Sequence, residues 1–184
     1  MYFGNNPQLP ATITTDVSTS SWDNIIQTFP YIDNDARAIL KNNPSRWRQF
    51  MLTAKQRMIV DMKEDANADA LRSLFQFQHL VIREECNDRL IRGSATIRAE
   101  TIKDAQKKLV DVAEDLSRNQ QRLITSFEKC IVFCKNIQSP LLKEKYQKAL
   151  ANIIEDAFDT FEKLSKHFNQ FLDTRLGAQA PASF

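Results

Sequence analysis

The chain has 184 residues, of which 42% are hydrophobic, and its formal net charge is +2. We therefore expect one domain with a real core, and a charge this balanced excludes any case for nucleic acid or membrane binding from net charge alone. An odd number of cysteines, Cys86, Cys130 and Cys134, with no disulfide framework indicates a reducing compartment.

The first elements along the chain are short. Residues 1–19 are polar, contain two prolines and show no periodicity, so we expect a flexible N-terminal arm. Ser21 is expected to cap a helix over Trp22–Phe29, and Asp33 a second helix over about 34–41. A short polar side chain at such a position accepts hydrogen bonds from free N–H groups of the first turn.

Long helices are expected next, because the 95 residues from Ser45 to Ser139 contain no proline and one glycine, Gly93. Ser45 is expected to cap the first long helix. The segment Lys63–Asp69 is polar all round, and is either an exposed turn of one continuous helix or a break. One apolar face steps by three or four residues in its first half: Trp47, Phe50, Met51, Ala54, Met58 and Met62.

Gly93 is expected to end this helix, and Ser94 to cap the next one, which runs to about Ile137. Asn119 or Gln120 forms a single polar layer in its seam, and such layers usually fix helix register. The other seam residues are apolar: Ile102, Ala105, Leu109, Val112, Leu116, Leu123, Phe127, Cys130, Cys134 and Ile137.

Ser139 and Pro140 are strong start signals for the last helix, because proline at the first helical position lacks an N–H that would be unpaired anyway. Gly177 is expected to end that helix and to leave a mobile tail over 178–184.

Very short connections force consecutive helices to lie antiparallel. We therefore predict an all-α fold. It is an elongated antiparallel three-helix bundle of 45–92, 95–137 and 140–176 with coiled-coil-like seams, plus two short N-terminal helices, within a single domain over 20–177.

No residue pattern predicts catalysis, a metal site or a cofactor. His79 and His167 lie beside apolar residues, and neither Glu-x-x-His nor His-Glu-x-x-His occurs. Cys130 and Cys134 share a helix face but continue the apolar seam, which favours packing. An acidic group is read as a solvated face, since lysines follow it: Glu155, Asp156, Asp159 and Glu162.

The most informative functional signal is a basic segment over 37–57, because no acidic residue lies between Asp35 and Asp61. A basic amphipathic helix here would bind an anionic membrane or phosphoinositide, or a partner's groove, or phosphates including nucleic acid. The alternative is that its apolar residues pack on the bundle. The candidate partner- or anion-binding residues are Arg37, Lys41, Arg46, Trp47, Arg48, Lys55 and Arg57.

Phe77 lies about 100° from the main stripe of its helix. Either two neighbouring helices bury it, or it marks an apolar contact patch that would support dimerisation or a partner groove.

Three functions are weighed. A non-enzymatic protein–protein interaction module, such as an adaptor, scaffold or chaperone-like protein, is favoured because long seams occur without a catalytic constellation; its partner would be another protein. A peripheral binder of anionic membranes is the alternative. An enzyme ranks lowest, and would require a converging cluster of buried polar side chains.

The expected location is the cytoplasm, because the first 20 residues lack a signal-peptide pattern and no apolar run reaches the length of a membrane span. A helical rod ended by a short tail also suits an effector delivered into a host cell.

Overall fold

The computed structural model describes residues 27, 29, 31–43, 46–92 and 97–179. Several expected features lie outside these residues: the arm over 1–19, most of the helix over 22–29, the caps at Ser21, Ser45 and Ser94, and the end at Gly93. The described part of the chain is all-helical and contains no strand. Its helices are α3 (Asn34–Asn42), α4 (Trp47–Glu64), α5 (Ala68–Arg92), α6 (Ala99–Asn136) and α7 (Pro140–Gln179).

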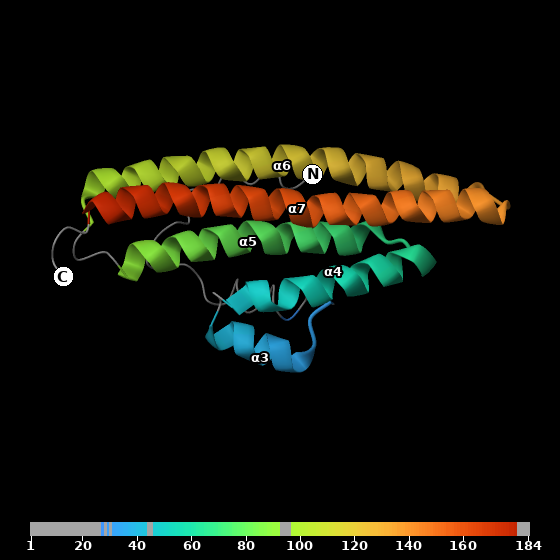
Figure 1. Cartoon of the computed structure of the whole chain (residues 1–184), viewed down its shortest axis with the longest axis horizontal. Helices are drawn as coiled ribbons and strands as arrows, with labels where there is room; N and C mark the ends of the chain where they lie inside the picture. The colour runs from blue at the N-terminus through green and yellow to red at the C-terminus, as the bar shows by residue number, and fades with distance from the viewer. Residues whose placement is uncertain (1–26, 28, 30, 44–45, 93–96, 180–184) are drawn as a thin grey trace.

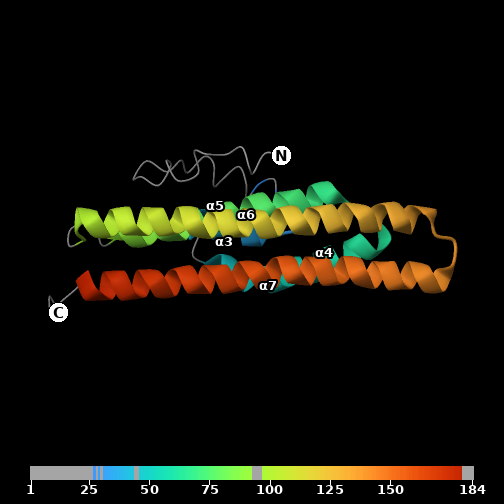
Figure 2. The same cartoon turned by 90° about the horizontal axis from the view of Figure 1, so that it is seen from above.

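The four longer helices lie side by side and alternate in direction (Figure 1). Helices α6 and α7 form one long antiparallel pair, α5 packs along α6, and α4 packs along α7. The view from above agrees, because α5 lies beneath α6 and α4 beneath α7 (Figure 2). Helix α3 lies alongside α4, on the side away from α5 (Figure 1).

The predicted three-helix arrangement is not confirmed, because its first arm, 45–92, consists of two helices. Helix α4 stops at Glu64, and α5 starts at Ala68 and runs back in the opposite direction (Figure 1). Of the two alternatives for the polar segment 63–69, the break is therefore the one observed. Asn67 stabilises the new start, because its Oδ1 accepts a hydrogen bond from the backbone N–H of Asp69 at 2.8 Å.

Two helix starts agree with the sequence, and one predicted end is wrong. The side chain of Asp33 caps α3, accepting from the N–H of Ala36 at 2.8 Å, and α7 begins at Pro140. Gly177 does not end α7, which continues to Gln179. No glycine among the described residues has a positive φ, so Gly177 keeps helical backbone geometry. Of the predicted tail, 178–179 are helical and 180–184 lie outside the described residues.

The predicted seam of α6 is in the core from Ala105 to Phe127 and only partly buried at Ile102, Cys130, Cys134 and Ile137. Gln120 is the polar layer, with 1% of its surface exposed, whereas Asn119 is half-buried. Buried apolar residues occupy the positions on either side of it: Ala105, Leu109, Val112, Leu116, Leu123 and Phe127.

Candidate interaction surface

Trp47, the aromatic residue predicted to contact a partner, is a core residue. None of its surface is exposed, and its indole Nε1 donates a hydrogen bond to Glu85 Oε2 at 2.8 Å. Its ring meets that of Phe161 on α7 edge to face, with 5.0 Å between centroids. The prediction that Trp47 faces a partner is therefore wrong, because α4 turns this side towards α5 and α7.

Two arginines of the predicted basic segment bond within the chain. Arg37 is half-buried and donates from Nη2 to the carbonyl oxygen of Phe29 at 3.0 Å, which ties α3 to the preceding segment. Arg57 on α4 forms an ion pair with Asp33 at 3.8 Å, so it links α4 to the cap of α3. The Arg57 pair is exposed to solvent, so it contributes little to stability.

The other basic residues of this segment lie on α3, directly before α4 and within α4. Arg46 is exposed and donates to Gln49 Oε1 through Nε and Nη2. Lys41 is exposed on α3, and Lys55 is half-buried on α4. The side chain of Arg48 lies outside the described residues. The sequence run 37–57 is thus divided between α3 and α4, and the apolar face of α4, with Trp47, Met51 and Ala54, is buried in the core.

Phe77 is fully buried and is not an exposed contact patch. Its ring stacks on that of Phe29 with 5.0 Å between centroids and 10° between planes. The alternative in which neighbouring segments bury Phe77 is the one observed, although the ring that covers it precedes α3 in the chain.

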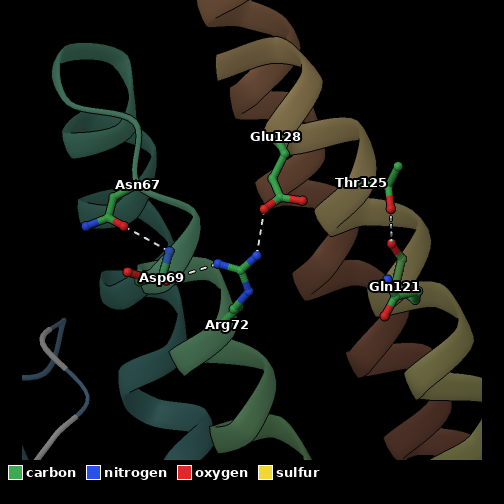
Figure 3. Close-up of polar contacts among 6 residues, drawn as sticks. All are labelled: Asn67, Asp69, Arg72, Gln121, Thr125 and Glu128. Carbon is green, nitrogen blue, oxygen red and sulfur yellow. Dashed lines mark hydrogen bonds and ion pairs between the residues drawn. The ribbon is translucent and has the colours of Figure 1, made fainter. Parts of the chain in front are cut away.

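A different surface is exposed at the end of the α6–α7 pair. Arg72 at the start of α5 pairs with Glu128 on α6 at 2.6 Å and with Asp69 at 3.0 Å (Figure 3). Burial lowers the pKa of Arg72, but the hydrogen bonds and charges of Glu128 and Asp69 outweigh burial and raise this pKa overall. On the other side, Gln147 on α7 donates to the carbonyl oxygen of Lys63 near the end of α4.

These contacts mark where α4 and α5 stop covering the long pair. The α6–α7 pair extends beyond the ends of both shorter helices (Figures 1 and 2). We call the end of this pair, residues 129–146, the hairpin tip. Cys130, Ile131 and Cys134 continue the seam into the tip and are only partly buried there.

Four large apolar side chains are exposed on the hairpin tip. The exposed fractions are 58% for Val132, 51% for Phe133, 77% for Leu141 and 48% for Leu142. The ring of Phe133 stacks on that of Tyr146 across the pair, with 5.3 Å between centroids and 12° between planes. Large apolar side chains gathered in one place on a surface commonly mark a binding site.

The charges on the hairpin tip are mostly positive. The only acidic residue in 129–146 is Glu144. All of its lysines are exposed: Lys129, Lys135, Lys143 and Lys145. The tip therefore combines apolar side chains with a net positive charge.

Sequence reasoning missed this surface. A signal was available, because Val132 and Phe133 lie off the seam of their helix and Leu141–Leu142 directly follow Pro140, within a lysine-rich stretch. What the sequence could not provide was the point at which α4 and α5 end.

A buried polar cluster lies deeper in the bundle. Gln120 on α6 donates from Nε2 to Gln78 Oε1 at 2.9 Å, and its Oε1 lies 2.9 Å from His79 Nε2. Ser117 Oγ is 3.2 Å from the same nitrogen, and Gln78 donates to the carbonyl oxygen of Ala157 on α7 at 3.2 Å. Burial lowers the pKa of His79 to about 4, against a smaller opposite effect of the Gln120 hydrogen bond.

This cluster meets only part of the condition set for an enzyme. Its polar side chains converge, but their hydrogen bonds are made within the fold. The amide of Gln120 on α6 bonds to Gln78 and His79 on α5, and Gln78 also bonds to the backbone of α7. Such a network holds the helices in one register. It also explains why Gln120 is tolerated in the core, because its amide is hydrogen-bonded.

The cysteines show no reactive environment. Cys86 is fully buried, and burial raises the pKa of its thiol to about 12. Burial also raises the pKa values of Cys130 and Cys134. Reactive cysteines have lowered pKa values instead. All three thiols are free.

Comparisons with known proteins give no assignment. The chain matches no family model, no curated protein and no solved structure. Within the described residues, no group of three or more His, Cys, Asp or Glu side chains is placed to hold a metal ion. None of the described helices has a stretch long and apolar enough to cross a membrane.

Proposed function

We propose that this chain is a non-enzymatic interaction module: a helical body that binds a partner surface through the hairpin tip. The observation that carries the proposal is the exposure of Val132, Phe133, Leu141 and Leu142 together at one end of the α6–α7 pair. Burying apolar surface is the main favourable term in most association reactions. A body presenting such a surface at its end is suited to an adaptor or scaffold.

The rest of the chain forms a rigid body that holds this tip. Helices α6 and α7 run the full length of the body and are braced from below by α4 and α5 (Figures 1 and 2). The hydrogen-bonded layer of Gln78, His79 and Gln120 fixes α5 against α6, and through Ala157 also against α7. Binding to a preorganised surface loses less conformational entropy than binding to a mobile one.

A paired-variant experiment tests the proposal. Leu141→Gln and Leu142→Gln are combined in one variant, because both side chains are exposed and glutamine is a good helix former. The matched control combines Leu52→Gln and Val60→Gln on α4, where the exposed fractions are 60% and 62%. Both variants must keep the helical circular dichroism spectrum of the wild type.

The readout is the sedimentation of the labelled chain on a density gradient after mixing with whole-cell lysate. We expect the wild type and the α4 control to migrate as larger complexes and the tip variant to migrate as the free chain. The proposal fails if the tip variant keeps the complexes of the wild type, or if the wild type itself migrates as the free chain.

A further inference from the structure

We propose that the hairpin tip docks on an anionic membrane surface, with its apolar side chains in the headgroup region and its lysines on lipid phosphates. This inference rests on the proposed function, because it names the partner of the same surface. Three observations favour a lipid surface over a protein groove: the distribution of the apolar side chains, the choice of cations and the position of the tip.

The exposed apolar side chains of the hairpin tip are divided between α6 and α7 and do not form one stripe on one helix. Val132 lies five residues after the buried Phe127, which places it about 140° around α6 from that core position. Leu141 lies nine residues before the buried Leu150, which places it about 180° around α7. A helix or groove of a partner protein would cover one stripe. A bilayer interface surrounds an inserted end on all sides.

The cations of the tip suit phosphates at a fluid surface. Lys135, Lys143 and Lys145 carry long flexible stems, so each can lie along apolar surface while its ammonium reaches the headgroups. Residues 129–146 contain neither arginine nor tryptophan. Those two residue types, together with tyrosine, dominate the energetic centres of protein–protein interfaces, and the one tyrosine here, Tyr146, is half-buried against Phe133.

The tip also has the right position and size. It is the end of the longest axis of the body, so it can touch a plane without hindrance from α3, α4 or α5 (Figure 1). Leu141 and Leu142 lie in the first turn of α7. Insertion of that turn would bury them to the shallow depth of about 5–10 Å at which interfacial helices lie.

The test is flotation of the full chain with vesicles of phosphatidylcholine containing phosphatidylserine, and with vesicles of phosphatidylcholine alone. We expect the wild type to float with the anionic vesicles and to be released by high salt, since lysine–phosphate attraction is screened. It should stay with the soluble fraction when the vesicles are neutral.

Two variants and their controls locate the effect. One variant combines Leu141→Gln and Leu142→Gln, and the other reverses the charge of Lys135, Lys143 and Lys145 to Glu. Reversing three charges should weaken binding to anionic vesicles by about tenfold or more. The controls are the Leu52→Gln, Val60→Gln pair on α4 and reversal of three exposed lysines elsewhere, Lys103, Lys163 and Lys166, each of which should float as the wild type does.

The outcomes separate this inference from the proposed function. Flotation lost in both tip variants and kept in both controls supports membrane docking. Absence of flotation in the wild type, or an equal loss in the controls, overturns it. A third outcome is that the wild type does not float but forms a complex in detergent-solubilised lysate, and that this complex requires the tip leucines. The tip is then a protein-binding surface, so membrane docking fails and the interaction module stands.

Discussion

Burial of His79 predicts a stability that falls in mild acid. Only 7% of the residue is exposed, and burial lowers the pKa of the folded imidazole from 6.5 to about 4. Between these two values the unfolded chain binds the proton more tightly than the folded chain does. The contribution of His79 is therefore complete above pH 6.5 and is lost as the pH falls towards about 4. The difference corresponds to about 3 kcal/mol of unfolding free energy.

The measurement is urea unfolding followed by circular dichroism at several pH values within this interval. The wild type is compared with His79→Gln, which does not titrate and keeps an amide that can bond to Gln120. Titration of the carboxylates is common to both proteins, so it cancels in the difference between their unfolding free energies. That difference should shrink or change sign, by about 3 kcal/mol in total, as the pH falls.

An exposed residue far from the buried cluster provides the control. Leu52 on α4 is 60% exposed, so Leu52→Gln should keep the pH dependence of the wild type. Parallel pH profiles for the wild type and His79→Gln would refute the reasoning, because they would mean that the imidazole takes up its proton in the folded state without cost. A flattened profile in Leu52→Gln would mean that the measured pH dependence does not report on His79.

Three further predictions concern stability and are measured by urea unfolding. Phe29→Ala should lower the free energy of unfolding by about 3 kcal/mol because the ring is fully buried, whereas Phe133→Ala on the tip should lower it by less than about 1 kcal/mol. Equal losses would contradict the burial of Phe29. Gly177→Ala should raise the free energy of unfolding by about 0.5 kcal/mol, since an added Cβ meets nothing within 4 Å. A lower free energy of unfolding would mean that this glycine ends the helix. Gln120→Leu should lower the free energy of unfolding by about 2 kcal/mol because it leaves His79 without its amide partner. An unchanged free energy would show that the polar layer contributes nothing to stability.

The helical class and several helix starts followed from local chemistry. Asp33 and Pro140 act within a single turn, so their roles can be read from the sequence and agree with the structure. Gly177 shows the limit of the same logic. Glycine permits a left-handed end but does not require it, and the following Ala178 and Gln179 are good helix formers.

The number of long helices depended on a feature that periodicity does not encode. The segment 63–69 is polar all round, which suits both a solvated helical turn and a chain reversal. In the structure α4 packs on α7 and α5 packs on α6, and both contacts form only because the chain reverses there. Tertiary packing therefore decided between the solvated helical turn and the chain reversal, which fit the local sequence equally well.

The basic segment illustrates the same problem for a binding site. A tryptophan beside arginines is what an amphipathic membrane helix would show, but any helix facing a core is amphipathic too. The contact of Trp47 with Glu85 and Phe161, on two other helices, settles its place. Neither contact could be inferred from the spacing of residues 46–62.

Among the described residues, the buried polar cluster and the hairpin tip both reverse the ordinary placement of polar and apolar side chains, and they differ in compensation. Inside, Gln78, His79 and Gln120 lose water but recover hydrogen bonds from one another, so the layer is satisfied within the fold. Outside, Leu141 and Leu142 remain 77% and 48% exposed to water. A satisfied reversal needs no further partner to account for it. The proposed binding would cover the exposed apolar end, and for that reason the proposal places function at the hairpin tip rather than at the buried cluster.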